Sequence, residues 1–124
     1  MTRVSSVLLG LAAAFAVLVP GAGAAAGQAH AAATCSLVGV YTKLGPTYVE
    51  KLSVHGVSCN TGKKLVTAYY NCRLKHGGTK GTCSSALGYR CSEKRQGGSP
   101  VEFVASVHCT KGRSVVDHTY TQSF

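Results

Sequence analysis

The sequence lacks an apolar run long enough to cross a membrane as a helix. Its longest apolar stretch, residues 7–19, has about 13 residues, whereas a spanning helix needs about 20. Arg3 precedes this stretch and small residues follow it, which is the order found in a secretory signal peptide. We therefore expect residues 1–31 to be a signal peptide and the mature protein to be secreted. Cleavage is expected after Ala31 or Ala33, although the alanine-rich run also permits earlier cuts.

Acidic residues are scarce, since the chain has 4 Asp and Glu residues against 13 Lys and Arg and a formal net charge of +9. Cleavage after Ala31 leaves residues 32–124, a length suited to a single domain, and removes only one of the basic residues. Outside a bacterial cell the abundant anions are wall polymers and lipid headgroups, which a positive field attracts. The expected anion-binding residues lie on or just after a predicted helix: Lys63, Lys64, Arg73, Lys75 and Lys80.

Closely spaced cysteine pairs are missing. Zinc sites usually contain a C-x₂₋₄-C pair, whereas intervals of 7 to 23 residues separate the six cysteines of this chain, Cys35, Cys59, Cys72, Cys83, Cys91 and Cys109. Their even number behind an export signal predicts three disulfides and no metal site. Such bonds would also brace a domain too small to be very stable by packing alone.

Cys72–Cys83 is the favoured pair, because it would join the end of the predicted helix to a loop rich in glycine and lysine. The other four cysteines have three possible pairings, which the sequence leaves open.

Glycine-rich phosphate-binding motifs are also absent. The glycines at Gly45, Gly77-Gly78 and Gly97-Gly98 fit neither the G-x-G-x-x-G nor the P-loop spacing, and we expect them at turns. The sequence therefore predicts no nucleotide cofactor.

Strand signals occur at both ends of the mature chain. Residues 36–43 and 47–57 are rich in β-branched and aromatic side chains and predict a hairpin, and residues 88–95 predict a third strand. Residues 101–109 alternate apolar and polar side chains and predict a fourth strand, which would pair with a fifth at the C-terminus.

One helix is expected between the second and third strands. Asn60 or Thr61 is its predicted cap, and Leu65, Tyr69 and Cys72 recur at helical spacing to make an apolar face. The predicted fold is α+β, a small disulfide-stabilised antiparallel sheet with one helix packed on one face, in the order β-β-α-β-β-β.

The register of the C-terminal hairpin follows if its turn centres on residues 111–112. Three pairs are then expected: Val107 opposite Val116, Phe103 opposite Tyr120, and Ser106 opposite Asp117. This register gathers apolar pairs on one face and most polar pairs on the other, and a one-residue slip would invert every side chain.

Ser106, His108 and Asp117 would share the polar face of this hairpin, where serine, histidine and an acid suggest a catalytic triad. However, residues i and i+2 of a strand lie about 6.5–7 Å apart, and no G-x-S-x-G motif is present. We interpret the three side chains as part of a polar outer face and expect no catalytic residues.

A small secreted ribonuclease is a second enzymatic alternative, because it needs only an acid and a base on a cationic surface. Its candidates are His55, His76, His108 and His118 with Glu50, Glu93 and Glu102. The predicted register places His108 and His118 on opposite faces, with His118 inward and half-buried, so nothing in the sequence brings the set together.

Three short motifs, Gly56-Val57-Ser58-Cys59, Gly88-Tyr89-Arg90-Cys91 and Val107-His108-Cys109, carry a family resemblance. In them and in its alanine-rich signal, the chain resembles small secreted cysteine-containing proteins of high-GC Gram-positive bacteria, of actinobacterial type. The resemblance covers most of residues 50–112 and implies an extracellular compartment without implying any catalytic residue. It also implies that Cys72 and Cys83, which lie outside the four-cysteine pattern of that group, pair with each other.

The leading hypothesis is a secreted, non-enzymatic module that binds anionic cell-envelope or extracellular polymers, with wall polymers or lipid headgroups as partners. One alternative is a protein-directed function, such as a protease inhibitor or a toxin. Another is a small hydrolase or ribonuclease.

Overall fold

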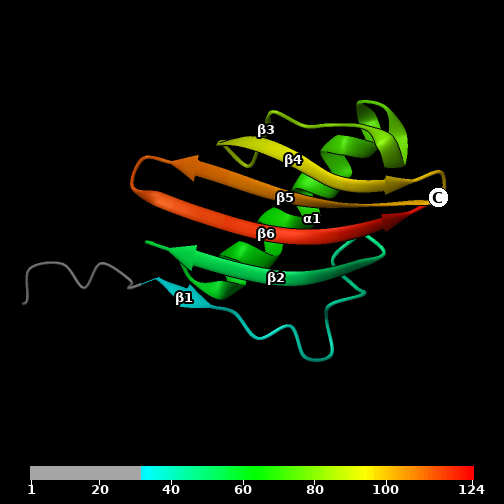
Figure 1. Cartoon of the computed structure of the whole chain (residues 1–124). Helices are drawn as coiled ribbons and strands as arrows, with labels where there is room; N and C mark the ends of the chain where they lie inside the picture. The colour runs from blue at the N-terminus through cyan, green and yellow to red at the C-terminus, as the bar shows by residue number, and fades with distance from the viewer. Residues whose placement is uncertain (1–31) are drawn as a thin grey trace, which may run out of the picture.

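Strands with apolar side chains on one face and polar side chains on the other build the protein around one helix. The computed structural model describes residues 32–124, so the signal peptide expected at residues 1–31 lies outside the described residues. The sheet has six antiparallel strands in the order β1-β2-β6-β5-β4-β3 (Figure 1). Their bounds are β1 Ala33–Thr34, β2 Tyr48–His55, β3 Ser85–Ala86, β4 Tyr89–Ser99, β5 Glu102–Lys111 and β6 Ser114–Ser123.

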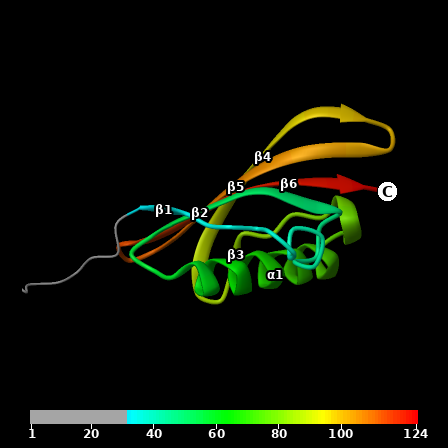
Figure 2. The same ribbon diagram turned by 90° about the horizontal axis from the view of Figure 1, so that it is seen from below.

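The helix α1, Cys59–Lys75, packs against one face of this sheet, and a short 3₁₀ turn, η1, follows at Gly78–Lys80. Seen from below, α1 and the sheet form two layers, and no other part of residues 32–124 covers the sheet face opposite α1 (Figure 2). The predicted α+β fold with one helix on one face is confirmed. The predicted order of elements omitted the two-residue strand β3, and its first strand, residues 36–43, does not correspond to β1.

The helix begins two or three residues earlier than expected. Ser58, rather than Asn60 or Thr61, is the cap, and its Oγ accepts a hydrogen bond of 3.2 Å from the N–H of Thr61. At Gly62 the helix approaches β2 so closely that an added Cβ would lie 2.7 Å from a methyl of Val54. A glycine at this position therefore lets the two layers meet.

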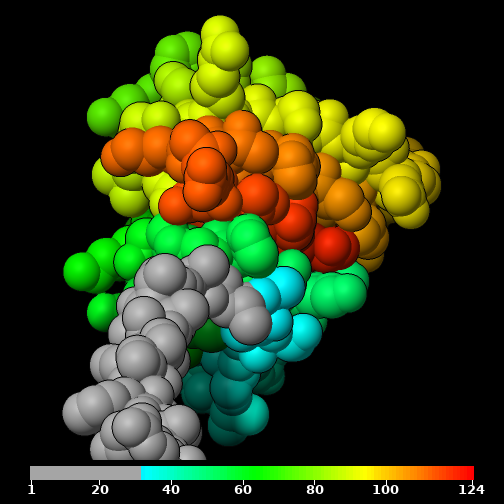
Figure 3. Space-filling view, turned by 90° about the vertical axis from the view of Figure 1, so that its left-hand side faces the viewer, coloured from blue at the N-terminus to red at the C-terminus, as the bar shows by residue number. Residues whose placement is uncertain are grey.

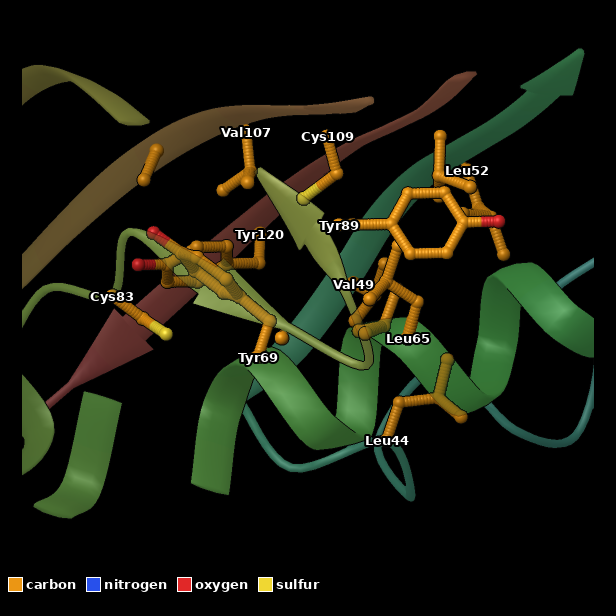
Figure 4. Close-up of a cluster of buried hydrophobic side chains, with 14 of the residues drawn as sticks. Leu44, Val49, Leu52, Leu65, Tyr69, Cys83, Tyr89, Val107, Cys109 and Tyr120 are labelled. Carbon is orange, nitrogen blue, oxygen red and sulfur yellow. The ribbon is translucent and has the colours of Figure 1, made fainter. Parts of the chain in front are cut away.

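The core lies between α1 and the sheet. Leu65 and Tyr69 of the helix face Leu52 of β2 and Tyr120 of β6, and all four side chains are buried (Figure 4). Val107 and the other inward residues of β5 complete this layer. The alternation that predicted the inward face of residues 101–109 is confirmed for Phe103 to Cys109.

Residues 36–43 do not form the predicted strand. The N–H groups of Val40 and Tyr41 both donate to the carbonyl of Leu37, which closes a turn within the segment. Strand pairing with β2 occurs earlier, at β1, and ends at Cys35, whose side chain is bonded to Cys59. The β-branched composition of the segment predicted a strand, but the chain turns after Cys35, which is bonded to Cys59.

The predicted partners in the C-terminal hairpin are wrong, although the predicted faces are right. Val107 lies opposite His118, Phe103 opposite Gln122, and Ser106 opposite Thr119. The turn is centred one residue later than expected because Gly112, with a φ of +57°, occupies the first position of the two-residue loop between Lys111 and Ser114. A displacement of one residue at the turn shifts each partner by two, so every side chain keeps its face.

Strand β4 is longer than the predicted 88–95, because it continues through a bulge near Gly97 as far as Ser99. Gly97 and Gly98, which were expected at a turn, therefore belong to the sheet. Only Pro100 and Val101 separate the paired residues Ser99 and Glu102.

All six cysteines are paired. The favoured bond Cys72–Cys83 is confirmed, and it joins the last turn of α1 to the segment before β3. The pairing that the sequence left open is Cys35–Cys59 and Cys91–Cys109. Cys91 and Cys109 are direct partners on β4 and β5, whereas Cys35–Cys59 ties the N-terminal segment to the first residue of the helix.

None of the helices within residues 32–124 has the length and apolar character required to cross a membrane.

Candidate functional site

The sheet face opposite α1, which we call the outer sheet face, carries two rows of polar side chains that cross four strands. The first row consists of register partners on β4, β5, β6 and β2, namely Ser92, His108, Asp117 and Ser53. The second row, one step along the same strands, consists of Lys94, Ser106, Thr119 and Lys51. Both rows line one hollow of about 490 Å³.

Two side chains of the first row, those of His108 and Asp117, are joined by a hydrogen bond. His108 Nδ1 is 2.5 Å from Asp117 Oδ1, and the two side chains are 56% and 49% exposed. The pair forms because the register places His108 and Asp117 directly opposite each other on β5 and β6. The expected pairing of Asp117 with Ser106 is therefore wrong, and Ser106 lies 3.5 Å from the hydroxyl of Thr119 instead.

Ser92, which no pattern in the sequence indicated as a site residue, lies in line with His108 and Asp117. Ser92 is the β4 partner of His108, on the side away from Asp117, so a hydroxyl, an imidazole and a carboxylate follow one another across three strands. No hydrogen bond within residues 32–124 joins His108 to Ser92 or to Ser106. Moreover, Ser92 lies inside a strand and not on a turn that would expose backbone amides to an oxyanion. The row is a polar surface without the groups that acyl transfer requires.

Two lysines mark the ends of the second row. Lys94 on β4 and Lys51 on β2 are separated by three strand spacings, or about 14 Å, with Ser106 and Thr119 between them. Neither lysine forms an ion pair within the described residues. The row is therefore a line of two hydroxyls with a cation at each end.

Further cations gather where β5 turns into β6. Figure 3 views this end of the molecule, where the orange chain of the turn lies between the yellow chain of β4 and the green chain of β2. Lys111 and Arg113 flank Gly112 in this turn and are exposed, and exposed Arg90 lies nearby as the partner of Thr110. The acids on the outer sheet face beyond the hollow lie towards the opposite end.

These acids are Glu50 and Glu102. Glu50 accepts a hydrogen bond from the hydroxyl of Thr121, and Glu102 accepts one of 3.0 Å from Ser123 Oγ. The outer sheet face thus carries Arg90 towards the β5–β6 turn and the two acids towards the Pro100 turn.

The residues predicted to bind anions on and after the helix are spread along it and differ in exposure. Lys64, Lys75 and Lys80 are exposed and Lys63 partly so, but Lys64 and Lys75 are about 16 Å apart along the helix. Arg73 is completely buried, so its assignment to an exposed cluster is wrong. A charge pattern in the sequence suggested a surface position, whereas contacts with distant residues hold this guanidinium inside.

Arg73 binds the loop that follows the helix. Its Nε donates to the carbonyl of Gly81 at 3.1 Å, its Nη2 donates to the carbonyl of Thr79, and its guanidinium lies 4.5 Å from the ring centre of Tyr120. Arg95 reaches the same loop from β4 and donates to the carbonyls of Lys80 and Gly81. The loop at residues 77–82 is thereby tied down by two arginines.

Glu93 is the acid at the centre of this buried cluster. It accepts hydrogen bonds of 2.8 Å from the Tyr69 hydroxyl and 2.7 Å from the Tyr120 hydroxyl, and Arg95 Nε lies 2.5 Å from its second oxygen. Figure 4 shows the two tyrosine hydroxyls close together beneath the sheet. Burial alone would raise the pKa of Glu93, but the hydroxyls and Arg95 outweigh it and lower this pKa. Burial, followed by the hydrogen bond to Glu93, raises the pKa of both tyrosines.

The histidines proposed for a ribonuclease are not brought together. His108 is exposed on the outer sheet face, whereas His118 is buried on the inner face, as predicted. Burial, aided by the positive charge of Arg73, lowers the pKa of His118 to about 4, and Glu93 and Asp117 oppose this shift. Neither ring nitrogen of His118 has a hydrogen-bond partner within residues 32–124. Glu93, a candidate acid, is bound inside the protein.

A metal centre has no basis in the described part of the chain, where no three His, Cys, Asp or Glu side chains gather in a way that could hold an ion. Compared with protein-family models, with curated proteins and with solved structures, the chain matches none of them.

Proposed function

We propose that the protein is secreted and that it binds anionic polymers of the cell envelope or the extracellular space, without catalysing a reaction. The observation that carries this proposal is the unequal use of charge. Each Asp and Glu side chain in residues 32–124 has a partner within the protein, whereas most lysines and arginines form no ion pair there.

The carboxylates are engaged as follows. Glu93 binds Arg95 and two tyrosine hydroxyls, and Asp117 binds His108. Glu50 and Glu102 accept hydrogen bonds from the hydroxyls of Thr121 and Ser123, respectively. Within the described residues, the only lysine or arginine ion pairs are those of Arg73 and Arg95 with Glu93. The remaining cations keep an uncompensated positive charge that attracts polyanions.

Secretion is supported by the covalent structure. Three disulfides, with no free cysteine among the described residues, suit an oxidising compartment. The apolar stretch near the N-terminus has the composition of a signal peptide.

The proposal is tested by sedimentation of the purified mature protein with isolated bacterial cell walls. We expect co-sedimentation at low ionic strength and progressive release as salt rises, because salt screens contacts between exposed charges. A neutral insoluble polysaccharide such as cellulose is the control for adhesion by other forces.

If the protein stays in solution with the walls at every ionic strength, polymer binding is excluded. Equal sedimentation with cellulose, or retention that salt does not weaken, would show that charge is not the cause. Intact mass of the secreted protein tests export separately, since it reports the cleavage site and the loss of about six protons on disulfide formation.

A further inference from the structure

We propose that the outer sheet face is the polymer-binding site and that its ligand is a phosphate-linked polyol chain, with Lys51 and Lys94 each binding a phosphate. This inference rests on the proposed function, because it assigns the surface and the ligand chemistry to anionic-polymer binding. The chain lies in the hollow and crosses β4, β5, β6 and β2.

The charges in the hollow favour an anion. Lys51 and Lys94 enter it from opposite sides, and neither has an ion-pair partner in residues 32–124. Among the described residues, the hollow is lined by one carboxylate, that of Asp117. Its Oδ1 lies 2.5 Å from Nδ1 of His108. An ammonium group is a compact point charge that binds phosphate without the planar geometry that arginine requires.

The lysines are also held apart at a fixed distance, since each lies on a strand of the same sheet. Three strand spacings, or about 14 Å, separate their backbones. Lys64 and Lys75 of the helix are a comparable distance apart, but the hollow that Lys64 lines does not include Lys75, whereas Lys51 and Lys94 line the same hollow. A polymer with repeated anions, and not a single anion, is therefore the ligand that contacts both lysines at the ends of the second row.

Hydroxyl groups fill the space between the lysines. Ser53, Ser92, Ser106 and Thr119 all line the hollow, and each hydroxyl both donates and accepts hydrogen bonds. Such groups suit the phosphate oxygens and also the free hydroxyls of a polyol. The hollow, at about 490 Å³, lies in the size range of sites that take small organic molecules or a few polymer units.

The lining of the hollow, as the described residues form it, contains no tyrosine or phenylalanine, which favours a polyol phosphate over nucleic acid as the ligand. Proteins that bind single-stranded nucleic acid combine positive charge with aromatic side chains on which bases stack. In the described residues, no Tyr or Phe lines the hollow, and its exposed imidazole, His108, is held by Asp117. A chain without planar rings is the polyanion that this lining fits.

The experiment measures binding of a synthetic poly(glycerol phosphate) chain by calorimetry at several salt concentrations. The test variant is Lys51→Gln/Lys94→Gln, and the matched control is Lys63→Gln/Lys64→Gln, which removes the same charge from the opposite layer. All four lysine side chains are at least partly exposed, and thermal melting of each variant confirms that it folds. Single-stranded DNA and vesicles with anionic phospholipid headgroups are the comparison ligands.

We expect the outer-face variant to lose at least tenfold in affinity at low salt, and the helix variant to lose less than threefold. The slope of log affinity against log salt should fall by about one for each phosphate-binding lysine removed, and only in the outer-face variant. A second pair, Ser106→Ala/Thr119→Val, should weaken binding without changing this slope.

Several results would overturn the inference. Equal losses in the two lysine variants would place binding on the whole surface, which keeps the proposed function but removes the outer-face site. DNA bound as tightly as poly(glycerol phosphate) would remove the ligand class, and binding to the vesicles alone would replace it by a lipid surface. If the unaltered protein binds none of these anions, the proposed function fails together with the inference.

Discussion

Asp117 is hydrogen-bonded to His108, with 2.5 Å between Oδ1 and Nδ1, and among the described residues it is the one carboxylate that lines the hollow. The two residues are direct partners on β6 and β5. Asp117 lies beside the two lysines that we assign to phosphate binding. The negative charge of its carboxylate therefore acts on the same ligand.

Replacing Asp117 by Asn should therefore strengthen polyanion binding. The substitution removes a negative charge from the hollow at nearly constant volume, and exposed charge interactions of this kind are worth roughly 0.2–1 kcal/mol, or up to about fivefold in affinity. The measurement is the dissociation constant for poly(glycerol phosphate) at low salt. Glu102→Gln is the control, because this acid lies outside the hollow and is bonded to Ser123. Weaker binding by the Asp117 variant would mean that the carboxylate contacts the ligand or holds His108 in a required position.

The stability of the protein should fall between about pH 6.5 and pH 4 because of His118. The folded-state pKa of this buried imidazole is about 4, below its ordinary value of 6.5, so the unfolded chain binds more protons in this interval. The stabilisation is fully present above pH 6.5, declines as pH falls, and is lost below pH 4. A shift of this size corresponds to about 3 kcal/mol.

Urea unfolding at several pH values checks this prediction. His118→Leu should remove most of the decline over this interval, whereas His55→Ala, a change at an exposed histidine, should leave it in place. Glu93 has a lowered pKa and contributes a separate decline, which begins near the ordinary carboxyl pKa of 4.5 and continues as the pH falls further. An unchanged decline in the His118 variant would show that other groups cause it.

Periodicity predicted the faces of the elements but not their partners. Alternation in residues 101–109 indicates which side chains point inward, and a displacement of two residues keeps that alternation, so the pattern could not distinguish the two registers. The choice between them decides whether Ser106 or His108 lies opposite Asp117. The row containing Ser92 depends in addition on the β4–β5 register, for which the sequence offered no signal.

Residue type alone misplaced Arg73 and the segment 36–43. Arginine is rarely buried unless it is paired, and its partners here are the carbonyls of Thr79 and Gly81 and the ring of Tyr120. The two-residue period of a strand could have placed Glu93 and Arg95 on the inner face, because the apolar residues Tyr89 and Cys91 precede them at intervals of two. The turn at residues 36–43 could not be inferred while the partner of Cys35 was unknown.

The disulfide Cys35–Cys59 should contribute more to stability than Cys72–Cys83. Their sequence separations are 24 and 11 residues, and a longer closed loop restricts the unfolded chain more strongly. Cys35→Ala/Cys59→Ala should cost about 3–4 kcal/mol and Cys72→Ala/Cys83→Ala somewhat less, as measured by urea unfolding. Hydrogen exchange should also become faster in residues 33–47 of the first variant only, because β1 has just two paired residues. The reverse order of the two losses would show that native contacts, and not loop length, determine the effect.

Arg73→Met should destabilise the fold while leaving polymer binding unchanged. The variant loses the hydrogen bonds to the carbonyls of Thr79 and Gly81, although Glu93 keeps Arg95 as a charged partner. We expect a loss of about 3 kcal/mol, the lower end of the cost of removing one member of a buried charged network. Lys75→Met, two residues later and exposed, should cost less than about 0.5 kcal/mol. Both the free energy of unfolding and the salt dependence of poly(glycerol phosphate) binding are measured under conditions in which both variants are folded. A reduced salt slope in the Arg73 variant, without a change in stability, would restore this residue to the anion-binding surface.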